Sequence, residues 1–419
     1  MPKKIAFVDL LFNYPPDGGS WVDEYEIASR LQKHGHDICL FLPDFTRYTN
    51  RGVIKVSLPF QVKHINFSRY SFNRYSVPER FMKALEEYNP DYVVICDGYF
   101  LKPFLVNRIA QKYKVILRFY AYEIICGMNN HFQPQLKRNC NWNIFKNPFI
   151  CWGCVNWNLR TPTNFIKLFF EFNLYPLQMH FAQEYLASMA FFPDYPSKVK
   201  KALKAAHQII VYNQHLADII RPYNQHIQIT PSGIDINRFQ PKENYANPGI
   251  KKILLSGRIN DPVKGLNVVR DALRELWKKR QDFQLLITTD HSFFVTEPFM
   301  QKTGWLKPEE LPELYRSCDI SLVPSYWREA FGITALESMA SGLPVIASDT
   351  GGLHHTIENG LSGIHVTPGD PKMLQNKIEE LLDNESLRIQ LGKNARKRVE
   401  SLYNWDSIVE QYYVPLFES

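Results

Sequence analysis

The chain has 419 residues, of which 45% are hydrophobic and 22% are charged, and its formal net charge is +7 at pH 7. This length exceeds one ordinary domain, and the composition excludes a disordered or fibrous chain because it is that of a globular protein with a large core. The basic residues form no long run, so they favour phosphorylated ligands or an anionic membrane surface over nucleic acid.

The N-terminus is basic and then apolar, as a secretory signal would be. Asp9 interrupts it, and residues 13–17 follow without a small-residue cleavage site, so we expect a first strand there. The chain has no run of ~18 uninterrupted apolar residues, because residues 165–192, the nearest to one, contain charged side chains. We therefore expect no transmembrane helix and a cytoplasmic chain, with room for peripheral contact to a membrane.

Strand and helix patterns alternate along the first half. A buried strand is expected at 5–10, followed by a Gly18-Gly19 turn, an amphipathic helix at 21–34 and a second strand at 38–42. Residues 44–76 have no clear pattern. The alternation then continues with helices at 78–88, 103–113, 198–206 and 214–220 and strands at 91–96, 114–119 and 208–212. It predicts an α/β fold with a doubly wound sheet, whose ligands bind beyond the carboxyl ends of the strands.

Residues 124–197 interrupt this alternation as an aromatic-rich insertion. The aromatic side chains fit the core of an enlarged domain, an acceptor tunnel or an interfacial patch for a lipid-linked substrate. Four thiols of the insertion suit a structural zinc or an iron–sulfur cluster in a reducing compartment, and separate core cysteines fit equally well. These four are Cys126, Cys140, Cys151 and Cys154.

A second alternating region follows a linker at residues 240–249, which is rich in Pro, Asn and charge, so the domain boundary is placed at 245/246. Strands are expected at 252–256, 283–288, 320–323 and 343–347, and helices at 266–280, 309–317, 333–340, 371–382 and 385–400. This pattern predicts a second doubly wound sheet.

The segment 324–352 carries the chemistry. Glu329 lies in a loop and Glu337 in the helix after it, a spacing that lets both face one cleft. Gly332 allows close backbone approach, and the helix N-terminus suits an anion or sugar oxygens. Two carboxylates that only accept hydrogen bonds suit a hydroxyl-rich ligand. Taken alone, two such glutamates would more often be solvated surface charges.

This segment resembles the signature of the family 4 nucleotide-sugar glycosyltransferases, which belong to the glycosyl transferases of group 1. The matching residues are Glu329, Phe331, Gly332, Glu337, Met339, Ala340, Gly342, Pro344, Val345, Asp349, Gly351 and Gly352. Residues 228–239 resemble the family's segment before the interdomain linker, and residues 405–416 its terminal crossing helix. The resemblance implies a GT-B fold with two Rossmann-like domains facing a central cleft: residues 1–245, completed by 402–419, on the acceptor side, and 246–401 on the donor side.

The resemblance also implies roles for single residues. Arg258 and Lys264 would bind the donor diphosphate, the arginine in a bidentate fashion and the lysine as a point charge. Glu337 would bind the ribose hydroxyls and Glu329 a hydroxyl of the donor sugar. The implied catalytic residues are Glu329, Arg258 and Lys264, and the implied donor-binding residues are Gly19, Gly304, Trp305, Leu306, Ala330, Phe331, Gly332, Ile333 and Glu337.

The sequence departs from the family pattern in two places. Tyr122-Glu123 stands where many relatives have His-Asp near the sugar, so these two residues are candidates for the acceptor side, and a buried structural role fits them equally well. Residues 289–291, Thr-Asp-His, replace a turn that usually contains glycine.

The implied function is that of a retaining glycosyltransferase, which moves a sugar from a nucleotide diphosphate sugar to a hydroxyl of a glycan, a lipid-linked acceptor or a small molecule, with no metal or other cofactor required. The rival hypothesis is a catalytically inactive relative acting as a binding or scaffold subunit. The presence of Arg258, Lys264, Glu329 and Glu337 argues against it. A nicotinamide enzyme is excluded because neither glycine turn reads G-x-G-x-x-G.

Overall fold

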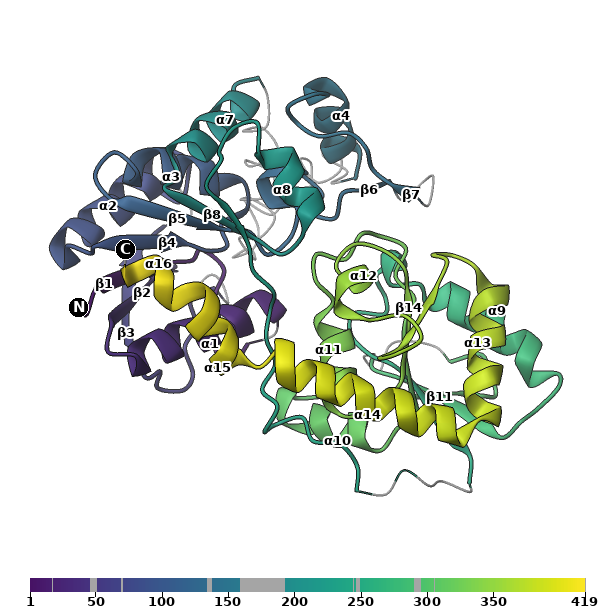
Figure 1. Ribbon diagram of the computed structural model, residues 1–419. Coiled ribbons are helices and arrows are strands. Elements are labelled where there is room, and N and C mark those ends of the chain that lie inside the picture. Colours follow the sequence, from purple (N-terminus) through teal and green to yellow (C-terminus); the bar gives the residue numbers. More distant parts are fainter. Residues whose placement is uncertain are drawn as a thin grey trace. The chain divides into compact units, whose positions relative to one another are not determined.

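A computed structural model describes residues 1–16, 18–45, 51–68, 71–133, 138–158, 193–243, 245, 249–289, 295–304 and 306–418. The chain divides into two compact units (Figure 1). The first comprises Met1–His131, Asn141–Thr230 and Val409–Ser419, and the second comprises Phe132–Cys140 and Pro231–Ile408. The first unit thus ends at Thr230, ahead of the boundary that the linker composition predicts at 245/246.

The first unit is built on a parallel sheet with the strand order β3-β2-β1-β4-β5-β8-β9. Its strands are β1 Lys4–Val8, β2 Asp37–Asp44, β3 Gln61–Asn66, β4 Tyr92–Ile95, β5 Lys114–Arg118, β8 Gln208–Val211 and β9 Ile227–Ile229. Its connecting helices are α1 Gly19–Lys33, α2 Ser76–Tyr88, α3 Lys102–Ile109, α7 Tyr195–Ala205 and α8 Gln214–Ile220. The central strands are buried apolar runs because helices cover both faces of a doubly wound sheet.

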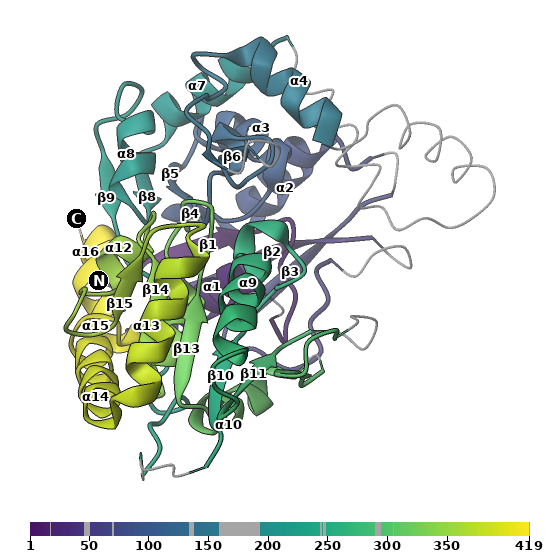
Figure 2. The same ribbon diagram turned by 90° about the vertical axis from the view of Figure 1, so that its right-hand side faces the viewer.

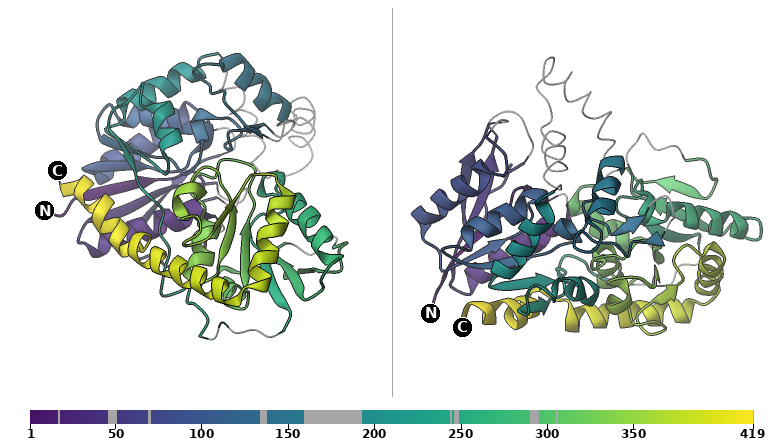
Figure 3. Two further views of the ribbon diagram at one scale, coloured as in Figure 1. Left: turned by 45° about the vertical axis from the view of Figure 1, so that its right-hand side comes forward. Right: turned by 90° about the horizontal axis from the view of Figure 1, so that it is seen from above.

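The end of the chain completes the first unit. After α15 (Trp405–Ile408), a π-helix (Val409–Tyr413) and α16 (Val414–Glu418) return to this unit, and the π-helix packs on α1. The ring of Phe417 lies 5.2 Å from that of Tyr92 and 5.9 Å from that of His36, measured between centroids. Both termini therefore lie beside each other at the first unit (Figure 3).

The described part of the insertion contributes to both units. It contains a short 3₁₀ helix (Glu123–Ile125), α4 (Pro148–Asn158) and a hairpin of β6 (Phe132–Gln133) and β7 (Arg138–Asn139). The hairpin packs in the second unit, where Arg328 N–H donates to Asn139 Oδ1 at 2.8 Å and the Arg328 guanidinium donates to the Cys140 carbonyl at 3.1 Å. The sequence assigned the whole insertion to the first domain, whereas the contacts of the hairpin group it with the second unit. Residues 159–192, with most of the predicted aromatic cluster, lie outside the described residues.

The second unit carries its own parallel sheet, with the strand order β12-β11-β10-β13-β14-β15 (Figure 2). Its strands are β10 Lys251–Leu255, β11 Phe283–Ile287, β12 Met300–Lys302, β13 Ile320–Val323, β14 Val345–Ser348 and β15 Ile364–Val366. Its helices are α9 Leu266–Trp277, α10 Leu311–Arg316, α11 Ile333–Ala340, α12 Leu353–Thr356, α13 Pro371–Asp383 and α14 Glu385–Leu402, with 3₁₀ turns at Pro262–Lys264 and Pro308–Glu310. Side chains from α9 and α13 pack on these strands to form one core.

A membrane-spanning helix was not expected. Within the described ranges, no helix is both long enough and apolar enough to cross a bilayer.

Candidate functional site

The candidate site lies where the strand order of the second sheet reverses. β10 and β13 are adjacent parallel strands, although β11 and β12 lie between them in the sequence. Gly257 and Arg258 follow β10, and the loop with Glu329 follows β13. Because the carboxyl ends of parallel strands share one edge, the fold brings both loops to the topological switch point, the usual place for ligands in such sheets.

An ion pair joins these two loops. Lys264 Nζ lies 2.7 Å from Glu329 Oε1, and the Ser325 hydroxyl donates to the same oxygen at 2.6 Å. Burial alone would raise the pKa of Glu329, but the Lys264 charge and the hydrogen bonds from Lys264 and Ser325 outweigh it, so this pKa lies below its usual value. Lys264 also lies over the Trp327 ring, 5.3 Å from its centroid. Glu329 is thus an ionised, oriented acceptor.

Glu337, on α11, is held by a different set of partners. The Tyr315 hydroxyl on α10 donates to Glu337 Oε2 at 2.7 Å and lies 2.6 Å from Ser256 Oγ at the end of β10. Burial raises the pKa of Glu337, and the Tyr315 hydrogen bond opposes that shift. Tyr315 and Ser256 were not predicted as site residues, since nothing in the local sequence relates them to Glu337.

Glycines bring backbone segments together around the start of α11. Gly332, the residue before α11, has a φ of 109°, and a Cβ there would meet Leu353 at 2.6 Å. A Cβ on Gly257 would lie 3.7 Å from Thr334 Oγ1, which places the Arg258 loop beside the first turn of α11. Only glycine combines the left-handed φ of Gly332 with so close a contact.

Arg258 differs from Lys264 in its surroundings. It is exposed, and its guanidinium has no hydrogen bond or ion pair with any other residue that the structure describes. Lys264 instead balances Glu329. The two cations that the sequence assigned to one diphosphate therefore differ: within the described part of the chain, the guanidinium is unpaired and the ammonium is paired with Glu329.

The structure also locates the remaining predicted donor-binding residues. Ala330, Phe331 and Gly332 form the chain between Glu329 and α11, and Ile333 is the first residue of α11. Gly304 follows β12 with a φ of 82°, and Leu306 comes shortly after it. Trp305 lies outside the described residues, as do Asp290 and His291. Gly19 is the first residue of α1 in the first unit.

Tyr122 and Glu123, the candidates for the acceptor side, are both buried in the first unit. Glu123 forms an ion pair with Lys102, whose ammonium also donates to the Arg118 carbonyl, and Tyr120 N–H donates to Glu123 Oε1 at 2.7 Å. These contacts favour the structural alternative. A contact to the acceptor stays a prediction.

The four cysteines of the insertion are described by the structure, and none of them is in a disulfide. They are not among the groups of described residues that lie close enough to share an ion. The zinc or iron–sulfur hypothesis stays a prediction from the sequence. Among described residues, the groups close enough to share an ion are Asp349–His354–His365 and the buried Asp9–Glu24–Cys96.

Residues 300–398, which contain Glu329, Glu337 and the whole of α11, match the family described as "Glycosyl transferases group 1". This part of the second unit is similar to the group 1 glycosyltransferases. Its resemblance to such enzymes, read from the sequence, is confirmed by this match.

Curated relatives of the chain include proteins named as glycosyltransferases. The chain is 30% identical to a D-inositol 3-phosphate glycosyltransferase of Corynebacterium kroppenstedtii over 210 residues, which are 44% of this chain and 46% of the relative. It is 29% identical to an MMP alpha-(1->4)-mannosyltransferase of Mycolicibacterium hassiacum over 197 residues, 45% and 47% of the two chains. The chain thus spans about half the length of the curated relatives it matches.

Solved structures extend the likeness to the whole chain. Sucrose-phosphate synthase from Thermosynechococcus elongatus superposes with a TM-score of 0.68 at 20% identity, covering 99% of both chains. Anabaena HepE in complex with UDP and glucose gives 0.66 at 15% identity, covering 100% of both. At such identities the likeness shows the fold, and it confirms the predicted GT-B class with a Rossmann-like sheet in each unit.

Proposed function

We propose that the chain is a retaining glycosyltransferase that moves a sugar from a nucleotide diphosphate sugar to a hydroxyl acceptor, in the synthesis of a glycan, glycolipid or glycoside. The observation that carries the proposal is the Lys264–Glu329 pair at the switch point, followed by α11 with Glu337. Glu329 and Glu337 lie inside the family-matched segment, and Lys264 precedes that segment in the sequence and contacts Glu329. The acceptor and the cytoplasmic location stay predictions from the sequence.

The diphosphate binds at the carboxyl end of β10, where the exposed Arg258 meets two phosphate oxygens and Lys264 adds a second positive charge. Because Lys264 already pairs with Glu329, its ammonium interacts with both the Glu329 carboxylate and the diphosphate once the donor is bound. Glu337 accepts hydrogen bonds from the ribose hydroxyls. Glu329, which is ionised and held by Ser325, accepts one from a hydroxyl of the transferred sugar.

Transfer proceeds on one face of the sugar. The acceptor oxygen forms its bond to the anomeric carbon on the side from which the leaving phosphate oxygen departs, and that phosphate oxygen takes the acceptor proton. The protein's part is to position both reactants and to stabilise the negative charge growing on the diphosphate. Arg258, Lys264 and the N-terminal end of α11 provide this stabilisation.

Calorimetry with uridine, guanosine and adenosine diphosphates tests the donor site, and a turnover screen with the corresponding nucleotide sugars then identifies the donor. We expect Arg258→Ala and Glu337→Ala each to weaken diphosphate binding at least tenfold, because each removes a contact to the part that all donors share. Lys278→Ala is the matched control, since Lys278 is exposed beside α9 and pairs with Glu275. Unchanged diphosphate affinity in both site variants would refute the proposed donor site.

A further inference from the structure

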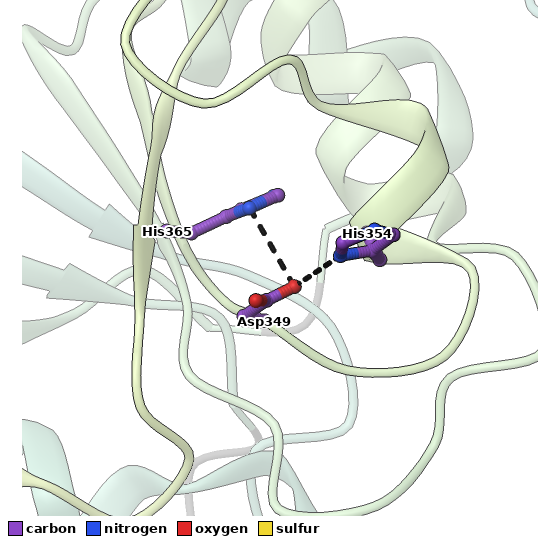
Figure 4. A group of neighbouring side chains, drawn as sticks. All are labelled: Asp349, His354 and His365. Atoms are coloured by element: carbon purple, nitrogen blue, oxygen red, sulfur yellow. Dashed lines mark hydrogen bonds and ion pairs between the residues drawn. The ribbon is translucent and has the colours of Figure 1, made fainter.

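A second cluster of polar side chains lies in the same unit, at the carboxyl ends of β14 and β15. Asp349 follows β14, His354 is on α12, and His365 is in the middle of β15. Asp349 Oδ1 lies 2.6 Å from His354 Nδ1 and 3.6 Å from His365 Nδ1 (Figure 4). One nitrogen of each ring and one carboxylate oxygen lie within 4.8 Å of one another, so three ligand atoms converge on one point.

We propose that Asp349, His354 and His365 bind a divalent transition metal ion of the zinc class. Zinc takes imidazole nitrogen and carboxylate oxygen at ~2.0–2.2 Å in a tetrahedron, which places neighbouring ligand atoms ~3.3–3.5 Å apart. The separations of 2.6 and 3.6 Å need shifts of less than about 1 Å to reach that spacing. Two imidazoles with one carboxylate are a donor set that zinc prefers over magnesium or calcium.

The exposure of the three side chains suits an ion that enters from solvent. His354 is 59% and Asp349 46% exposed, whereas His365 is only 9% exposed. The buried ring gives a fixed anchor, and the exposed pair can adjust around the ion and leave the fourth position to water.

The cluster is connected to the Glu329 loop through the backbone. Gly351 and Gly352 lie between two of the proposed ligands, and Gly352 N–H donates to the Glu329 carbonyl at 2.8 Å. A Cβ on Gly351 would come within 2.3 Å of that carbonyl oxygen. An ion bound to Asp349 and His354 would fix this turn and thereby the loop that rests on it. The binding itself does not depend on the proposed glycosyl transfer.

Titration of Zn²⁺ into the full chain, stripped with chelator and free of any histidine tag, tests the proposal by calorimetry. We expect one Zn²⁺ per chain and a thermal midpoint that rises with the ion. His354→Ala and Asp349→Asn should weaken binding at least tenfold and abolish the rise, and both positions are exposed enough for the variants to fold. His355→Ala is the matched control because His355 is the exposed neighbour of His354 on α12 and lies outside the cluster.

The four cysteines provide the competing source of zinc binding, so a Cys151→Ser/Cys154→Ser chain is titrated in parallel. If the cysteine variant still binds one Zn²⁺ per chain tightly, the result supports the Asp349 site. The proposal is overturned if tight Zn²⁺ binding is lost only in the cysteine variant. It is also overturned if the wild-type chain binds Zn²⁺ no more tightly than His354→Ala. Binding assays are decisive here even for a chain with no transferase activity, so failure of this site and failure of the proposed function are distinguishable.

Discussion

Each unit holds a lysine–glutamate pair next to its parallel sheet, and the two pairs differ in access to solvent. In the first unit the Lys102 and Glu123 side chains are 0% and 1% exposed. In the second unit Lys264 and Glu329 are 24% and 8% exposed. The enclosed Lys102–Glu123 pair is accessible only to its own protein neighbours. In the more open Lys264–Glu329 pair, the lysine can also interact with a ligand that arrives from solvent.

The pKa values of the two glutamates show the same contrast. Burial raises the pKa of Glu123 to about 7, although Lys102 opposes this shift. The pKa of Glu329 is lowered, because Lys264 and Ser325 outweigh the effect of burial. Removing ions from water is costly, and a partner offsets that cost only where the geometry is good and further hydrogen bonds are made. The comparison teaches that the two pairs differ in the access of their lysine to solvent, which a ligand-binding pair needs and a structural pair does not.

The largest expected effect comes from breaking the enclosed pair. Lys102→Ala leaves Glu123 buried without its cation and should lower the free energy of unfolding of the first unit by ~3–5 kcal/mol. Lys264→Ala should cost less, since the Lys264 side chain is 24% exposed and water can replace part of the lost interaction. Urea denaturation of the full chain, followed by a probe in each unit, measures both. An equal decrease in the free energy of unfolding for the two variants would contradict the proposed difference between the two ion pairs.

The open pair should instead control turnover. Glu329→Gln keeps the size of the side chain but removes the charge that orients Lys264 and accepts the sugar hydroxyl, so we expect turnover to fall about 100-fold, or ~3 kcal/mol of barrier. Nucleotide diphosphate affinity should change little. Initial rates at saturating donor, with calorimetry of the diphosphate alone, separate these two effects. Wild-type turnover in this variant would contradict a role in sugar binding.

The two glutamates should also give opposite pH dependences of stability. Since the pKa of Glu123 is raised from 4.5 to about 7, the folded state binds more protons than the unfolded state between these values, and stability falls as pH rises through this window. Relative to Glu123→Gln, wild type should lose up to ~1.4 kcal/mol per pH unit there.

The contribution of Glu329 has the reverse sign, because its pKa is lowered on folding. The stability that Glu329 contributes is fully present above the usual glutamate pKa and is lost as pH falls through the pKa of Glu329 in the folded state. Relative to Glu329→Gln, wild type should therefore lose stability on acidification. Denaturation midpoints of the two Gln variants and wild type between about pH 3 and 8, on about a half-unit grid, compare the signs directly, because the Glu329 window lies below 4.5. Parallel curves for wild type and Glu123→Gln would show that Glu123 does not titrate in this window.

The smallest expected effect concerns Tyr315. Tyr315→Phe removes the hydroxyl that orients Glu337 and leaves the buried ring in place. We expect diphosphate affinity to fall by ~1 kcal/mol, or about fivefold, with turnover at saturating donor unchanged. A variant with wild-type affinity would mean that Glu337 does not need Tyr315 to bind the ribose.

Much of the fold could be predicted from local patterns. Residues 333–340 and 214–220 form the expected helices, and 320–323 forms the expected strand. β3 was missed because it is an edge strand with the sequence QVKHIN, in which exposed and half-buried polar residues leave no apolar run. The hairpin of β6 and β7 was not predicted for another reason, since its strands have two residues each and it packs through contacts to Arg328 that no local pattern encodes.

The sequence alone determined the α/β class and the order of most strands and helices, because apolar periodicity and glycine placement are local properties. The candidate residues Arg258, Lys264, Glu329 and Glu337 came from the family resemblance of their segments. Only the tertiary structure decided which residues meet. It paired Lys264 with Glu329, buried Glu123 against Lys102, joined Tyr315 to Glu337 and brought His365 to Asp349. These contacts join residues on separate strands and helices. Which of them stay hydrated, and so remain open to a ligand, depends on how the sheets and helices pack around them.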